Sequence, residues 1–405
     1  MLSDEVIDML SERLVERIQE GNVYVLKKIG KAIKEIGTLN KTQAQQLAQV
    51  LKYGGSYQEI VYKLSQITGL NKKEIEDIFE EVAKQNLQFA KQFYDYKGVD
   101  FIPYKDNIAL QKQVQALATR AIYDYMDLSR TSALGIVRTN ELGKRAFVPL
   151  QKAYFELIDE AVLSVGQGKE TFDNQMYKII KEVGGGGLKV QYESGNVRRL
   201  DSAVRMNLKE ALRNMSNELQ HQFGEEYGAD GVEISVHENP ADDHALPQGR
   251  QFSNSEYDKL NAGLSAKTYD GVVIPADDKR RPISTLNCYH YIFSIVLGVS
   301  EPLFNKDELQ KIIDDNNKGF EMDGKHYTLY DGTQMQRKLE TEIRKQKDIQ
   351  IMGVASGNKQ VVDEAQQKIS QLTMKYKELS EKSGLPTRME RMRVSGYRRR
   401  NVSKI

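Results

Sequence analysis

Apolar residues recur with the spacing of helix faces through much of the chain. Close to the N-terminus they return every four residues, at Val6, Leu10, Leu14 and Ile18. A spacing of three to four residues places side chains on one helix face, where they can pack against another helix. Similar stretches, with few prolines between them, continue to about residue 182. We therefore predict long, mostly helical segments over residues 1–105 and 106–182.

Four consecutive glycines, Gly184 to Gly187, interrupt this pattern. A phosphate-binding P-loop would need Lys followed by Ser or Thr after the glycines, and this pair does not follow. We therefore expect a flexible hinge or a tight turn. Beyond the glycines, Ser194-Gly195 predicts the turn of a short hairpin. A further helix is predicted from the shared face of Leu200, Val204, Leu208, Leu212, Met215 and Leu219.

The pattern changes between residues 231 and 330. Apolar residues alternate with polar ones over 231–237, which is typical of a strand, and the β-branched and aromatic run at 289–297 predicts a second strand. Asp323-Gly324 predicts a two-residue hairpin turn. The long irregular connections between these elements are of the kind that often carries function.

Helical spacing returns near Thr333, where Thr333 and Gln336 have the spacing of a capping box. A break at residues 356–358 separates this helix from a second one, and Gly384 and Pro386 are typical stop signals. The second helix carries a short heptad seam of Val362, Ala365, Ile369, Leu372, Tyr376 and Leu379. This pattern predicts an antiparallel helical hairpin, or docking of the seam against a neighbouring subunit.

Together these elements predict an α+β fold that is predominantly α-helical. Four regions are expected: a helical region over 1–105, a second one over 106–230 with its hinge at 184–187, a small α+β domain over 231–330, and a helical hairpin with a basic tail over 331–405.

Charge is distributed unevenly along the chain, although the net charge is only +1. From Asp331 onward there are 17 Lys and Arg against 9 Asp and Glu, whereas the first 330 residues hold 41 and 48. Such an end favours an anionic partner, either nucleic acid or an acidic protein surface, or it forms a solvated, partly disordered tail. The basic side chains of the last twenty residues are Arg388, Arg391, Arg393, Arg398, Arg399, Arg400 and Lys404.

Composition excludes several classes of protein. The single cysteine, Cys288, excludes an intrachain disulfide framework and suits a reducing compartment. The longest apolar stretch, Tyr289 to Leu297, is shorter than the roughly 20 residues of a membrane-spanning helix. The N-terminal residues are not expected to form a signal peptide, because no basic segment precedes an apolar one.

Three of the five histidines and the only cysteine lie within residues 237–290. They are His237, His244, Cys288 and His290, and Asp242 and Asp243 directly precede His244. Imidazole and thiolate groups are ligands of tetrahedral Zn²⁺, so a zinc site is one interpretation, although the spacing matches no standard zinc module.

Other interpretations of this cluster remain open. The side chains could form a metal-free polar cluster that joins loops by hydrogen bonds. A hydrolytic site could use Asp242 or Asp243 to orient His244 as a general base. Cys288 could also be a nucleophile assisted by an imidazole, or simply a buried apolar residue.

The same segment resembles the minor capsid protein 2 family of phages, which is related to the Mu F-type head-morphogenesis proteins. The resemblance rests on the string from His237 through Asp243-His244 and Gln248-Gly249 to Phe252, and on Asn287-Cys288-Tyr289-His290. The block from Tyr327 to Arg344 also resembles the family. Members usually have Trp near the first two segments, whereas this chain has none, which suggests local repacking. The signature residues are His237, Asp243, His244, Gln248, Gly249, Asn287, Cys288 and His290.

The resemblance implies a non-enzymatic assembly protein of a tailed-phage head, present in few copies at or near the portal. It would be assembled in the host cytoplasm and would lie in the virion, in the head interior or near the portal, without contacting a membrane. Its partners would be the portal protein, the major capsid protein or both, and the basic C-terminus could contact viral DNA. The alternative is a metal-dependent hydrolase or nuclease centred on His237, His244, Cys288 and His290.

Overall fold

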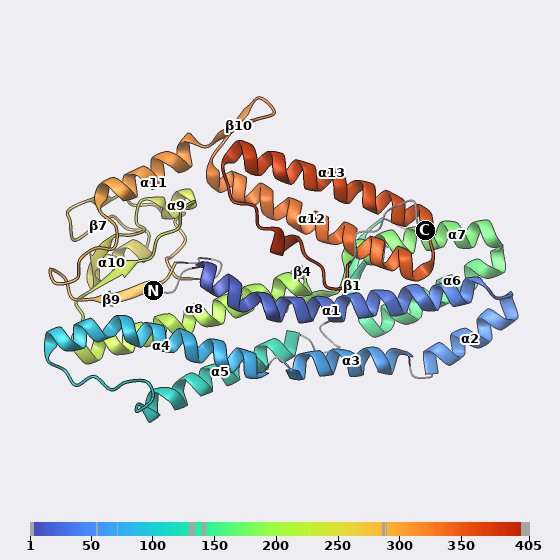
Figure 1. Cartoon of the computed structure of the whole chain (residues 1–405), viewed down its shortest axis with the longest axis horizontal. Coiled ribbons are helices and arrows are strands. Elements are labelled where there is room, and N and C mark those ends of the chain that lie inside the picture. The colour runs from blue at the N-terminus through green and yellow to red at the C-terminus, as the bar shows by residue number, and fades with distance from the viewer. Residues whose placement is uncertain are drawn as a thin grey trace.

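A computed structural model of the chain describes residues 4–53, 56–70, 72–128, 134–139, 143–285, 288 and 290–397. Figure 1 shows a long helical body with a small mixed region at one end. Helices account for 66% of the structure and the sheets are small and antiparallel. The predicted fold class, α+β and predominantly helical, is therefore confirmed.

The predicted N-terminal helices are present, and α1 is the axis on which the others pack. It contacts α3, α6, α8 and α12, and Figure 1 shows it between the α12–α13 pair and the helices α2 to α5. Its apolar stripe faces these neighbours, and Leu14 and Ile18 are almost fully buried. The helices are α1 (Asp4–Gly37), α2 (Lys41–Tyr53), α3 (Ser56–Leu70), α4 (Lys72–Lys97) and α5 (Ile108–Leu128).

Two strands interrupt the region that the sequence predicts as mostly helical. β1 (Leu134–Thr139) and β2 (Arg145–Pro149) form an antiparallel hairpin. With β3 (Lys189–Gln191) and β4 (Val197–Arg199), the predicted second hairpin, they make one sheet in the order β2-β1-β3-β4. The sequence did not indicate β1 and β2, because Leu134–Val137 is a continuous apolar run and its pairing with β3 is not local.

The glycine run packs one helix closely against another. The chain forms α6 (Leu150–Gln167), α7 (Lys169–Ile179) and then a π-helical turn (Ile180–Gly184), which ends at the first glycine of the run. A Cβ atom at Gly184 would lie 2.8 Å from the Cα atom of Ile349, so only glycine permits this approach. A turn follows at Gly187, where φ is +61°. The run therefore shows a buried helix contact followed by a tight turn, which is one of the two predicted alternatives.

The helix predicted after the second hairpin is α8 (Leu200–Tyr227). Its six predicted face residues are all buried, and it packs against α1, α4 and α5. It ends at Gly228, which adopts the left-handed conformation typical of a helix C-cap.

The small α+β region follows α8. Its central sheet has the order β6-β5-β9 and is antiparallel, and both predicted strands are shorter than expected. The turn at Asp323-Gly324 is confirmed, with positive φ at both residues. The elements are β5 (Gly231–Ile234), α9 (Asp242–Ala245), β6 (Gln251–Ser253), α10 (Asn254–Asn261), β7 (Ala266–Lys267), β8 (Val273–Ile274), β9 (Ile292–Ile295), α11 (Lys306–Lys318), β10 (Phe320–Met322) and β11 (Lys325–Tyr327).

The predicted helical hairpin consists of α12 (Leu329–Ser356) and α13 (Lys359–Ser383). The predicted capping box at Thr333 is wrong, because the helix begins one turn earlier. Thr328 accepts a hydrogen bond from the Asp331 backbone N–H, and the Asp331 carboxylate accepts one from the Thr328 N–H. After α13 the chain runs through a short 3₁₀ turn, η2 (Met389–Met392), back along the hairpin.

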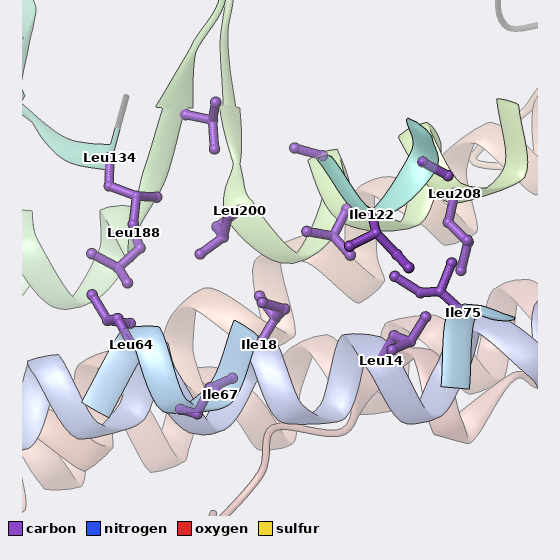
Figure 2. Close-up of a cluster of buried hydrophobic side chains, with 14 of the residues drawn as sticks. Leu14, Ile18, Leu64, Ile67, Ile75, Ile122, Leu134, Leu188, Leu200 and Leu208 are labelled. Carbon is purple, nitrogen blue, oxygen red and sulfur yellow. The ribbon is translucent and has the colours of Figure 1, made fainter. Parts of the chain in front are cut away.

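One hydrophobic core joins most of these elements. Figure 2 shows side chains of α1, α3, α4, α5 and α8 meeting beside the β3–β4 hairpin. The same core includes Ile349 and Met352 of α12 and Val361 and Ala365 of α13. The α+β region has a smaller core of its own around Ile234 and Phe252. The predicted regional boundaries themselves stay a prediction.

A buried group of charges joins the start of α8 to the middle of α12. Arg199 contacts Asp348 at 2.9 Å and Asp201 at 3.2 Å, and Arg344 contacts Asp201 at 3.3 Å. Asp348 is 0% exposed and the other three side chains are at most 10% exposed. Burial alone would raise the pKa of Asp201, but the two guanidinium groups hold that pKa well below its usual value.

We expect Asp348→Asn to lower the free energy of unfolding by about 1–3 kcal/mol, because the Arg199 guanidinium would lose one of its two charged partners inside the protein. Denaturant unfolding measures this loss. The control Glu378→Gln removes an acidic partner from an exposed pair with Lys382 on α13 and should leave stability nearly unchanged. Equal effects of the two substitutions would contradict the assignment of Asp348 as a buried structural charge.

Candidate functional site

The signature residues meet at one edge of the β6-β5-β9 sheet. Ile234 in β5 pairs with Ile292 in antiparallel β9, so the segment leaving β5 lies beside the segment entering β9. This pairing brings His237 against His290, with ring centroids 4.2 Å apart. The short helix α9 supplies Asp243 and His244 from the same side. Asn287 lies outside the described residues.

Three side chains converge at the centre of the cluster. The Cys288 Sγ atom lies 3.4 Å from His290 Nδ1 and 3.6 Å from His244 Nδ1. The three ligand atoms all lie within 4.8 Å of one another, and each residue is at most 3% exposed. Cys288 and His290 precede β9, so their convergence does not come from the alternation of side chains along a strand.

Gln248 fixes the orientation of the His290 ring. The Gln248 Oε1 atom accepts the backbone N–H of His237 at 2.9 Å, and its Nε2 atom donates to the carbonyl of the same residue at 3.1 Å. Because these two backbone groups differ in polarity, they determine which way the amide points. The Oε1 atom therefore also accepts from His290 Nε2, at 3.2 Å. His290 then carries its hydrogen on Nε2 and presents a bare Nδ1 to the sulfur.

A backbone carbonyl fixes His244 in the same way. The His244 Nε2 atom lies 2.8 Å from the carbonyl oxygen of Arg281, which can only accept, so Nε2 carries a hydrogen. Asp243 holds the Arg281 side chain with contacts of 2.7 and 2.8 Å. Asp243 therefore positions His244 mainly through Arg281, and Asp242 is exposed. The sequence did not indicate Arg281, because its role depends on a backbone oxygen.

Gly249 has a conformational and a steric role beside Gln248. Its φ is +68°, a region that other residues rarely adopt. An added Cβ atom would lie 2.3 Å from a methyl carbon of Leu309 and 2.6 Å from one of Val236. The Gln248-Gly249 pair of the signature therefore combines a side chain that clamps two backbone groups with a turn that only glycine fits.

The buried groups alter one another's proton affinity. Burial lowers the pKa of His244, but its contacts with Cys288, the Arg281 carbonyl and Asp243 raise that pKa above its usual value overall. Burial raises the pKa of Cys288, yet His244 and backbone N–H groups bring it below its usual value. Burial and the neighbouring positive groups hold the pKa of His290 well below its usual value. His244 and the backbone N–H groups thus shift Cys288 toward its deprotonated form, in a cluster that is shielded from solvent.

The first part of the basic C-terminal segment packs on the helical body. Lys347 donates to the Met392 carbonyl at 2.6 Å, and Arg344 donates to the Arg391 carbonyl. Val394 packs with Val23 and Ile351, while Arg393 is exposed and Arg388 is partly exposed. Arg398, Arg399, Arg400 and Lys404 lie outside the described residues. The sequence left the order of this tail open, and through Tyr397 it has a defined place.

No helix among the described residues is both long and apolar enough to cross a membrane.

Comparison with known proteins assigns the chain to a family. No curated protein and no solved structure shows significant similarity to the chain. The family described as phage minor capsid protein 2 matches residues 2–380, which is nearly the whole chain. The match includes the helical body, the signature segments and the C-terminal hairpin, and the chain therefore belongs to the phage minor capsid protein 2 family and is a structural protein of the phage head.

Proposed function

We propose that this head protein works at or near the portal, without catalytic activity. Its helical body docks on the portal or major capsid protein, and its basic C-terminal end contacts the packaged DNA. The observation that carries the proposal is that exposed apolar side chains lie on the N-terminal helices, whereas an exposed basic side chain, Arg393, lies on the C-terminal segment.

Eight of the large exposed apolar side chains in the described part of the chain lie on helices α2 to α6 and their connections. Four of them lie in or beside the α4–α5 connection and expose 37–60% of their surface: Tyr96, Val99, Ile102 and Ile108. Large side chains of this kind, grouped within 13 residues, are typical of a surface that another protein covers. The acidic balance of the first 330 residues disfavours DNA as the partner of this surface.

The basic C-terminal segment is held to the helical body where it begins. Contacts from α12 fix the backbone at Arg391 and Met392, so the segment leaves the body from a defined point. Arg393 is exposed, and no carboxylate in the described part of the chain pairs with it. Arginine side chains without acidic partners bind DNA phosphates in a sequence-independent and salt-sensitive manner.

Burial argues against the alternative of a hydrolase or nuclease. A substrate phosphate or carbonyl group would have to reach His244, Cys288 or His290, each of which exposes at most 3% of its surface. The hydrogen bonds of Gln248 and the Arg281 carbonyl also occupy the outer nitrogen atoms of both imidazoles. The cluster thus supports the structure of the α+β region.

The docking surface predicts that Ile102→Asp with Ile108→Asp will reduce incorporation of the protein into assembled heads several-fold. Charges would have to be buried where apolar groups now meet the partner. Quantitative mass spectrometry of purified particles, relative to the major capsid protein, measures this loss. The control Leu264→Asp with Leu303→Asp changes two similarly exposed leucines of the α+β region and should incorporate normally. Normal incorporation of the first variant would remove this surface from the proposal.

The basic end predicts weaker binding to duplex DNA when Arg398, Arg399 and Arg400 are all replaced by Gln. The plot of log affinity against log salt should become less steep by about 2–3, since each lost phosphate contact contributes about 0.9. Fluorescence anisotropy at several salt concentrations measures both quantities.

The matched control replaces Lys279, Lys318 and Lys325, three exposed lysines of the α+β region, by Gln. This variant loses the same net charge but should keep most of the salt dependence. Equal slopes for the two triple variants would show that net charge alone, and not the C-terminal end, determines DNA affinity.

A further inference from the structure

We propose that His244, Cys288 and His290 bind one Zn²⁺ ion, which fastens the loops of the α+β region to each other. This site does not depend on the function proposed above, because it follows only from the hydrogen bonds and the geometry of the cluster.

The cluster has too few hydrogens to be satisfied without a cation. Each ring uses its N–H on the far side, toward the Arg281 carbonyl or Gln248 Oε1, so both Nδ1 atoms face the sulfur as bare lone pairs. A thiol has one hydrogen and can donate it to only one of two acceptors. If the proton moves to His244, the other nitrogen still faces a sulfur lone pair at 3.4 Å. A cation placed among the three atoms satisfies all of them at once.

The spacing of the sulfur from each nitrogen fits zinc. Tetrahedral coordination with Zn–S near 2.3 Å and Zn–N near 2.0–2.1 Å places sulfur and nitrogen ligands about 3.6 Å apart. The two sulfur–nitrogen distances are 3.4 and 3.6 Å. One thiolate with two imidazoles is a mixed set of soft and borderline ligands, which favours Zn²⁺ over Mg²⁺ or Ca²⁺. His237, whose ring lies against His290, or a water molecule would complete the coordination.

The surroundings are those of a metal site. Histidine ligands of zinc usually donate their second N–H to a carbonyl or carboxylate, which fixes the ring and raises its basicity. Both imidazoles have such a partner, and Asp243 supports one of these partners through Arg281. The Ser284 backbone N–H donates to the Cys288 sulfur at 3.2 Å, which stabilises a thiolate.

Zinc here would have a structural role. His244 and Cys288 are 44 residues apart, and the residues described between them form only short strands and one helix of eight residues. The separate core of this region consists of seven buried hydrophobic side chains, far fewer than the main core. One ion bound by His244 and Cys288 would link the two ends of this segment and stabilise it, since few apolar side chains are buried there.

The first test measures metal in the full-length chain purified without metal-affinity resin. We expect about one zinc per chain by inductively coupled plasma mass spectrometry. After chelation, the chain should melt at a lower temperature and recover on addition of one equivalent of Zn²⁺. Addition of Co²⁺ instead should produce a thiolate-to-cobalt charge-transfer band in the near ultraviolet. Because Cys288 is the only cysteine, this band reports on this site alone.

Two variants complete the experiment. Cys288→Ser should lose the charge-transfer band and the stabilisation by zinc, whereas His221→Gln, a change at an exposed histidine on α8, should keep both. The band of the unmodified chain can be measured even if Cys288→Ser folds poorly. A chain that contains no zinc as purified and shows no cobalt band would overturn the proposal and leave a thiol–imidazole hydrogen-bonded cluster.

Discussion

The buried charges at the start of α8 determine how the parts of the helical body fit together. Arg199 ends the β3–β4 hairpin, Asp201 begins α8, and Arg344 and Asp348 lie on consecutive turns of α12. Each charge has its opposite partner only when α12 lies at one rotation and one height against α8, because any other arrangement would leave a charge unpaired inside the protein. Asn22 of α1 joins the same point by accepting the Leu188 N–H at 2.7 Å. Apolar contacts alone would permit α12 to pack against α8 in several registers, whereas the pairing of the buried charges permits one.

The uneven charge of the chain has a different meaning once the structure is considered. Two of the basic residues after Asp331 are held by the protein itself, because Arg344 belongs to the buried cluster and the partly buried Lys347 donates to the Met392 carbonyl. Burial and the nearby Arg344 lower the pKa of Lys347 to about 8. These two residues fix the C-terminal segment to the body, and the charge available to an outside partner is concentrated beyond them. The positive end therefore includes residues that anchor the segment to the body as well as residues, such as Arg393, that are exposed.

The sequence predicted the features that depend on neighbours in the chain and missed those that depend on distant ones. Helix faces and the Asp323-Gly324 turn follow from local spacing, and they are confirmed. The cap of α12 was predicted too far along the chain, because Thr328 and Thr333 both have an acceptor three residues later and only Thr328 forms the capping box. Gly184 was interpreted as a break, since its contact with Ile349 comes from 165 residues away. The cluster residues were identified, but Arg281 contributes a backbone oxygen that no side-chain pattern reveals.

The two cores are stabilised by different means, and this difference explains why the signature lies in the smaller one. In the helical body the burial of many apolar side chains favours the fold, and substitutions that preserve apolar character and volume are tolerated there. In the α+β region a few polar groups replace apolar area, and each has a specific partner: Gln248 binds both backbone groups of His237, and His244 binds the Arg281 carbonyl. An exchange of Gln248 for another polar residue would leave buried donors or acceptors unsatisfied. This loss of stability is larger than the loss caused by a small cavity among the aliphatic side chains of the main core. Strict residue identity is therefore expected where the core is small, and it follows from structural requirements without any need for catalysis.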